Sequence, residues 1–323
     1  MKNFSRIILG IVSGAVIFGS LLAIANRQDI LDALALRGYT PNQRVVSLAD
    51  ATTMNDNTRR VFYVNHPELN DKESFRQNCS AAEQSIVLGC FVERKGIFLL
   101  DVTDERLNGV IEVTAAHEVL HAQYDRLSSG ERKRVDDMTN KFFATVTDER
   151  IKKTIEQYRA KDPSVVPNEL HSILATEIRS LSPELEAYYG KYFKDRSKVV
   201  DFSEKYEQTF VDLTDQVENF DEQLKTMKQT IETGQKQIDE QNAQIETQKA
   251  NLDALLNSGR TEEYNAAVPA FNAQVSSYNR LVNSTRGTID EYNQIVEKRN
   301  AIATAEQELI EAIDSNVEPK KTQ

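Results

Sequence analysis

The residues Ala115-Ala116-His117-Glu118-Val119-Leu120-His121-Ala122 decide the fold class that we expect for this chain. Two histidines four residues apart on an α-helix lie one above the other on the same face. Both imidazole rings can therefore reach one zinc ion, and this spacing is a zinc-binding signature. The flanking residues are uncharged, as a buried helix requires. The stretch predicts a core helix on which His117 and His121 bind Zn²⁺.

Glu118 follows the first histidine directly and so points toward the same ion. A bound zinc ion lowers the pKa of a coordinated water molecule to about 7, and a neighbouring carboxylate can take up the proton that this water releases. We therefore expect Glu118 to be the general base of a hydrolytic site. The alternative is that His117 and His121 bind no metal and are simply packed on an ordinary core helix.

A third metal ligand has to come from elsewhere, and a helix predicted over residues 168–181 offers two carboxylates and one histidine, His171, which lies at one margin of the apolar stripe. Glu177 falls at the centre of its apolar stripe, whereas Glu169 lies at the margin. A carboxylate on an apolar face is costly to bury unless a cation balances its charge, which favours Glu177. The alternative is an ion pair between Glu177 and an arginine such as Arg179 or Arg106. The stripe consists of Leu170, Ile173, Leu174, Ile178 and Leu181.

Over roughly residues 97–193 the chain resembles the gluzincin group of zinc metallopeptidases, in which a glutamate from a downstream helix completes the metal site. The resemblance rests on the His-Glu-x-x-His stretch together with Asn168-Glu169 and Thr176-Glu177. Asn168-Glu169 is similar to the Asn-Glu pair that supplies the third ligand in thermolysin-like members. Ile173, however, stands where those members have an acidic residue. The resemblance favours Glu169 and the helix face favours Glu177, and we place Glu177 first.

The resemblance also implies that an edge strand lines the active cleft and pairs with an extended peptide substrate. We expect Ile97–Val102 to be that strand. Peptide hydrolysis further needs a hydrogen-bond donor for the oxyanion that develops on the scissile carbonyl. His171 is the first candidate because it lies two residues past Glu169. Tyr188 and Tyr189 are the others.

The N-terminus predicts the compartment. Lys2 and Arg6 precede an uncharged run from Ile7 to Ala25, which is about long enough to cross a bilayer as a helix. Positive charge on the short N-terminal side predicts a single-pass anchor in the cell membrane with the rest of the chain outside the cytoplasm. The alternative is a signal peptide cleaved after Ala23-Ile24-Ala25, which would make the protein secreted.

Two further observations agree with export and limit the partners. Cys79 and Cys90 are the only cysteines, and an oxidising compartment would let them form a disulfide. The formal net charge of −11 argues against nucleic acid or anionic lipid as the main partner, because binding to either needs a basic surface.

The chain divides into regions of different character. After an anchor or signal at residues 1–25, residues 26–200 read as an α+β zincin-like domain with strands expected at 61–64, 85–92 and 97–102. From about Phe202, apolar residues recur in steps of three and four, broken at Asn257-Ser258-Gly259-Arg260. This pattern predicts an antiparallel all-α coiled-coil hairpin over residues 201–316, followed by a polar tail at 317–323.

Together these features predict a membrane-anchored, extracytoplasmic zinc endopeptidase that acts on protein or peptide substrates and can bind a protein partner through the coiled coil. Three visible protein ligands would leave the fourth zinc position open, as in catalytic sites. The alternatives are a non-catalytic, membrane-tethered coiled-coil interaction protein with a structural zincin domain, and a cell-wall amidase.

Overall fold

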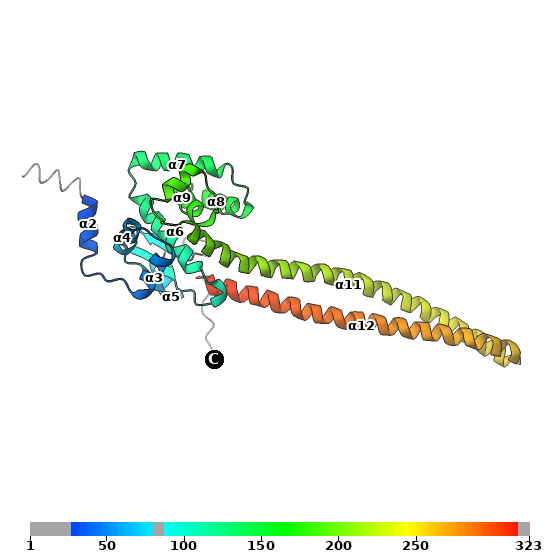
Figure 1. The fold of residues 1–323 in the computed structure, drawn as a ribbon. Coiled ribbons are helices and arrows are strands. Elements are labelled where there is room, and N and C mark those ends of the chain that lie inside the picture. The colour runs from blue at the N-terminus through cyan, green and yellow to red at the C-terminus, as the bar shows by residue number, and fades with distance from the viewer. Residues whose placement is uncertain (1–26, 80–86, 316–323) are drawn as a thin grey trace, which may run out of the picture. The chain divides into compact units, whose positions relative to one another are not determined.

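The computed structural model describes residues 27–79 and 87–315 (Figure 1). It has the expected α+β character, with many helices and one small sheet. The described residues fall into two compact units. The first holds the residues up to Gln208 and those from Leu309 onward, and the second holds Thr209–Glu308.

The sheet has three strands, and the strand order is β1-β3-β2. They are β1 (Glu68–Asn70), β2 (Gly89–Val92) and β3 (Gly96–Leu100). The central strand β3 runs parallel to β1 and antiparallel to β2. Strands β2 and β3 confirm the strands expected near 85–92 and 97–102, and they pair as a hairpin, whereas β1 was not expected. Because β3 is central, the edge strands of the sheet are β1 and β2.

Both faces of β3 are buried, and each face packs against a different core. Ile97 and Leu99 belong to the main hydrophobic core. Phe98 and Leu100 pack on the opposite side, with Phe75 of α5 (Lys72–Asn78) and Cys79. Since successive side chains of a strand point to opposite faces, one five-residue strand joins the two cores.

The disulfide between Cys79 and Cys90 is formed and confirms the predicted pairing. It links the C-terminal end of α5 to the edge strand β2. Structural disulfides persist mainly in oxidising compartments, so the bond indicates a location outside the cytoplasm.

Helices surround the sheet in the first unit, and α6 (Val110–Asp125) and α9 (Val166–Glu177) lie in contact within its core. The predicted strand at 61–64 is wrong, because these residues end the helix α4. Asn55 caps that helix by accepting a hydrogen bond from Thr58 N, and Thr58, Val61 and Phe62 are buried at helical spacing. The remaining helices of this unit are α2 (Arg27–Ala35), α3 (Gln43–Ala51), α4 (Asp56–Val64), the 3₁₀ turn η1 (Glu105–Leu107), α7 (Ser129–Phe143), α8 (Glu149–Lys161) and α10 (Pro183–Tyr189).

The second unit confirms the long helix pair. It consists of most of α11 (Ser197–Asn257) and α12 (Thr261–Ile313), which run side by side (Figure 1). The turn between them contains Gly259 with φ +72°, a conformation that glycine adopts without strain. An ion pair between Arg299 and Asp221, at 2.9 Å, joins the two helices 78 residues apart in sequence. The pairing is therefore antiparallel.

No helix within residues 27–79 and 87–315 is long and apolar enough to cross a membrane. The anchor predicted at residues 7–25 lies outside the described residues.

The two ends of the helix pair belong to the first unit. Phe202 and Tyr206, near the start of α11, pack against the main core. Near the end of α12, Leu309 is fully buried and Lys72 donates a hydrogen bond to the carbonyl oxygen of Glu311. Arg76 also donates to the carbonyl oxygen of Ser315, at 3.1 Å. The core of the first unit therefore includes residues from both ends of the hairpin.

Excision of residues 209–308 alone should leave the first unit folded, whereas truncation after residue 200 should destabilise it. Packed helices lie about 8–10 Å apart, so a flexible linker of about six residues can join Gln208 to Leu309. We expect the excised chain to keep its thermal midpoint, and the truncated chain to lose several degrees because buried apolar side chains are removed. Circular dichroism melting measures both. Equal destabilisation of the two chains would contradict the division.

Candidate metal centre

Helix α6 presents its two histidines toward α9. Ala115 and Ala116 are fully buried, and their small side chains allow close packing around this helix. The rings of His117 and His121 meet edge to face with centroids 4.7 Å apart. The structure thus places both imidazoles on one face, as their spacing predicts.

The carboxylate of Glu169 reaches both histidines from the first turn of α9. Its Oε2 lies 3.5 Å from His117 Nε2, and its Oε1 lies 3.6 Å from His121 Nε2. The three residues offer ligand atoms that all lie within 4.8 Å of one another. Two ligands about 2 Å from a tetrahedral zinc ion are about 3.3 Å apart, so this group can hold a metal ion with little adjustment.

The environment of Glu169 also fits a cation. Its Oε2 is buried and has no partner in hydrogen-bond geometry among the described residues. Burial alone would raise the pKa of the Glu169 carboxyl, but attraction to His121 and His117 outweighs this effect and lowers the pKa. The carboxylate is therefore held ionised in a buried place, where a metal ion would complete its coordination.

His121 has a second contact that orients its ring. The hydroxyl of Ser172 on α9 lies 3.4 Å from His121 Nδ1, and both groups are buried. Metal-binding histidines commonly use one ring nitrogen for such a contact and the other for the metal. This contact leaves His121 Nε2, the nitrogen facing Glu169, free to act as a ligand.

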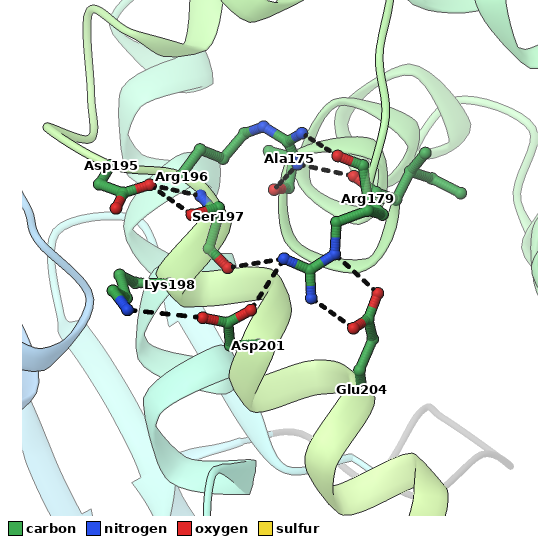
Figure 2. A network of polar contacts seen from close by, with 9 residues as sticks. Ala175, Arg179, Asp195, Arg196, Ser197, Lys198, Asp201 and Glu204 are labelled. Atoms are coloured by element: carbon green, nitrogen blue, oxygen red, sulfur yellow. Dashed lines mark hydrogen bonds and ion pairs between the residues drawn. The ribbon is translucent and has the colours of Figure 1, made fainter.

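Helix α9 is fixed at its C-terminal end by Arg196 (Figure 2). The Arg196 guanidinium donates to the carbonyl oxygens of Ala175, Ile178 and Arg179 at 3.0, 2.7 and 2.9 Å. The last carbonyls of a helix have no partner within the helix, so the guanidinium takes the place of the missing turn. Its own charge is balanced by Glu186, at 3.0 Å. These bonds help to fix the helix that carries Glu169.

The side chain of Arg179 forms a second link from the end of α9 to the start of α11. It pairs with Asp201 at 2.8 Å and with Glu204 (Figure 2). Arg179 is therefore not the partner of Glu177 that the sequence suggested.

Glu177 lies outside the metal-binding group. It is the last residue of α9, and its Oε2 accepts a hydrogen bond from Arg150 of α8 at 2.7 Å. The predicted helix 168–181 was too long, because Ile178 already has an extended backbone. Its apolar stripe therefore included Ile178 and Leu181, which lie beyond the helix. The structure reverses our ranking and favours Glu169 as the third ligand.

Glu118 is 5% exposed, and its side chain lies against Gly89 of the edge strand β2. A Cβ atom at Gly89 would come within 2.9 Å of Glu118 Oε1 and 2.8 Å of its Cγ. The absence of a side chain at this position lets β2 approach the motif. The edge strand beside the site is β2 and not the predicted Ile97–Val102, because that segment forms the central strand β3.

A cavity of about 1200 Å³ opens over the three candidate ligands and Glu118. Its walls come from β2, α6, α8, α9 and Tyr206 of α11. Tyr158 of α8 lines the cavity and hydrogen-bonds the Glu169 carboxylate. Tyr158, Gly89 and Ser172 were not predicted from the sequence, because each reaches the site through tertiary packing and none belongs to a motif.

A cluster of charges lies farther along the cavity wall. Arg150 bridges Glu177 and Glu207, which lies 2.8 Å away. Burial, and repulsion from Glu177, raise the pKa of the Glu207 carboxyl to about 7, against the opposing attraction of Arg150. This end of the cavity therefore has an arginine between two carboxyl groups.

The predicted oxyanion donors lie behind the site. His171 is fully buried, and its Nε2 lies 3.0 Å from the Tyr188 hydroxyl. The Tyr189 hydroxyl donates to the carbonyl oxygen of His171 at 2.8 Å. Burial, with repulsion from the two motif histidines, lowers the pKa of His171 to about 3, so the ring is neutral. None of His171, Tyr188 and Tyr189 is among the described residues that line the cavity.

Comparison with protein-family models, curated proteins and solved structures found no match to this chain. The geometry of the site is therefore the basis for any functional conclusion.

Replacement of Glu169 should weaken zinc binding far more than replacement of Glu177. Glu169→Ala removes one of three ligand atoms, whereas Glu177→Ala removes only the partner of Arg150. We expect Glu169→Ala to retain less than about a tenth of the wild-type zinc affinity, in keeping with loss of a direct ligand. Zinc titration against a competing chelator measures this. His117→Ala serves as the positive control, and a stronger effect at Glu177 would contradict the assignment.

Proposed function

We propose that this protein is a zinc-dependent endopeptidase that works outside the cytoplasm and is anchored in the membrane by residues 7–25. The observation that supports this most directly is the convergence of His117, His121 and Glu169, with Glu118 beside them, at one cavity. A closed structural zinc site uses four protein ligands, whereas three ligands and an adjacent carboxylate are the composition of a catalytic site.

Each residue of the site would have a separate role in hydrolysis. Zinc, when bound, would supply a Lewis acid that activates water and polarises the scissile carbonyl. Glu118 would accept a proton from the attacking water and return it to the leaving amine. Tyr158 takes the place of His171 as our candidate for the oxyanion donor, because its ring lines the cavity and its hydroxyl contacts a ligand.

The shape of the site favours a polypeptide as substrate. Sites for drug-sized molecules measure about 300–1,000 Å³. The cavity is somewhat larger, at about 1200 Å³, and one wall is an edge strand. An extended peptide can add to such an edge by main-chain hydrogen bonding. A cell-wall amidase would share the metal chemistry, and the strand edge is the observation that favours a polypeptide substrate.

The hairpin formed by α11 and α12 is proposed to bind a protein partner or to restrict which substrates approach. A non-catalytic interaction protein is the main alternative for the whole chain. The two functions differ in their need for Glu118, because binding to a partner requires no general base.

Glu118→Gln should abolish hydrolysis and leave the metal in place. The amide keeps the size of the side chain but cannot accept the proton, so we expect turnover of an unstructured protein such as casein to fall by at least about 100-fold. Zinc content, measured by atomic absorption, should remain near one ion per chain. A wild-type protein that binds zinc but cleaves nothing, or a fully active Glu118→Gln variant, would refute the proposed mechanism.

Gly89→Ala should impair catalysis through the position of Glu118. The added methyl group would meet Glu118 Oε1 at 2.9 Å and Thr114 Cγ2 at 2.5 Å, so one or both side chains must move. Displacements of this size commonly cost tenfold or more in kcat, and we expect that loss with zinc binding retained. Gly130→Ala is the matched control, because nothing lies within 4 Å of the methyl group it adds. Equal activity of the two variants would contradict the close approach.

A further inference from the structure

Helix α2 (Arg27–Ala35) exposes apolar side chains and buries a charged one. Asp32 is 3% exposed and faces the protein, whereas Ile30, Leu31 and Leu34 are 46%, 46% and 60% exposed. Helices on the surface of a globular domain normally bury the apolar face and expose the polar one. On α2 this arrangement is reversed.

The polar face of α2 is held to the domain by ion pairs. Arg126 binds both carboxylate oxygens of Asp32, at 2.9 Å each, and Arg60 lies 3.5 Å from the same group. Gln28 donates a further hydrogen bond to Asp32 at 2.9 Å, and Arg60 also pairs with Asp29 at 3.0 Å. Burial opposes ionisation of Asp32, but these partners outweigh it and lower its pKa. The helix is therefore fixed through an ionised, buried carboxylate.

This attachment determines which side of α2 faces outward. Residues of an α-helix advance by about 100° each. Ile30 and Leu34 are each two residues from Asp32, so both lie opposite it, and Leu31 borders them. Gln28, four residues from Asp32, returns to the attached face. Ile30, Leu31 and Leu34 form what we call the outer face of α2.

The sequence before α2 indicates what covers the outer face. The uncharged run from Ile7 to Ala25, long enough to cross a bilayer, ends two residues before Arg27 begins the helix. A helix that begins there starts at the membrane surface.

We propose that the outer face of α2 lies in the interfacial layer of the lipid bilayer. Interfacial helices bury an apolar face at the boundary between headgroups and acyl chains, and flanking basic residues strengthen the attachment. Ile30, Leu31 and Leu34 are the large apolar side chains that α2 exposes. The inference rests on the membrane segment predicted at residues 7–25 and goes beyond the proposed peptidase activity.

The attachment links the membrane to the metal helix. Arg126, which binds Asp32, is also the C-cap residue that directly follows α6. It lies nine residues after His117, or about 13 Å along the helix axis. If α2 is bound to the bilayer, it would therefore hold α6, which carries His117 and His121, in one orientation relative to the membrane surface. No flexible linker separates α2 from this contact with α6.

Tryptophan fluorescence can test the position of the outer face directly, because the chain has no tryptophan. Full-length Leu34→Trp and Gln28→Trp would each be reconstituted into phosphatidylcholine–phosphatidylglycerol vesicles, with and without bromine on the acyl chains. Gln28 is the closer of the two to the membrane segment but lies on the attached face. Ile30→Trp is a second probe of the outer face, in case the change at Leu34 disturbs folding.

We expect the tryptophan at position 34 to emit at shorter wavelength than tryptophan in water. Brominated acyl chains should quench it at least about twofold more than the tryptophan at position 28, because only the outer face enters the lipid. The tryptophan at position 30 should behave like that at position 34. Equal quenching at 28 and 34 would overturn the proposal, because proximity to the anchor alone would then explain it. A blue shift that disappears on diluting the protein in lipid, without bromine quenching, would show that a second copy covers the face. No outcome depends on peptidase activity.

Discussion

The placement of one carboxylate between two imidazole rings is the constraint on which the centre of this structure depends. Glu169 is largely buried, and a buried carboxylate is costly unless a cation or hydrogen-bond donors balance it. Its Oε2 has no partner in hydrogen-bond geometry among the described residues, while His117 and His121 stand 3.5 and 3.6 Å away. Several packing contacts around the site help to fix this geometry. The small residues of α6 allow close packing around it, and Arg196 fixes the end of α9.

The sequence predicted the parts of the fold whose signals are local. The spacing of His117 and His121, the disulfide and the long helix pair all depend on short patterns or on cysteine count, and the structure contains each of them. The errors fall where tertiary contacts decide. Val61–Val64 has strand-like residues but completes a helix that starts at a capping asparagine. Helix α9 stops at Glu177 and not at Leu181. The Arg196 guanidinium, which binds the carbonyl oxygens of Ala175 and Ile178 at this end, is 19 residues later in the chain than Glu177.

The contact between β2 and α6 places an edge strand of the sheet beside Glu118. Gly89 lets the edge strand approach Glu118, and the next residue, Cys90, is tied to α5 by the disulfide. The strand is therefore fixed at the residue after the glycine. A general base needs a defined position, because proton transfer depends on distances of a few tenths of an ångström. The disulfide, predicted as a mark of the compartment, also restrains a wall of the cavity beside the candidate metal site.

The same electrostatic requirement separates the candidate metal ligand Glu169 from the structural carboxylates. Asp32 binds Arg126, Glu177 binds Arg150, and Glu186 binds Arg196, so each of these three has a permanent cation supplied by the chain. Glu169 differs from them, because it faces two imidazoles that are charged only when protonated. A neutral imidazole offers one nitrogen lone pair, and a metal ion between the rings and the carboxylate would bind these lone pairs and balance the negative charge of Glu169. Sequence analysis applied the correct rule, that a buried carboxylate needs a cation, but could not show which carboxylate already had an arginine. The fold assigns Arg150 to Glu177, and Glu169 is left as the carboxylate whose charge a metal ion would balance.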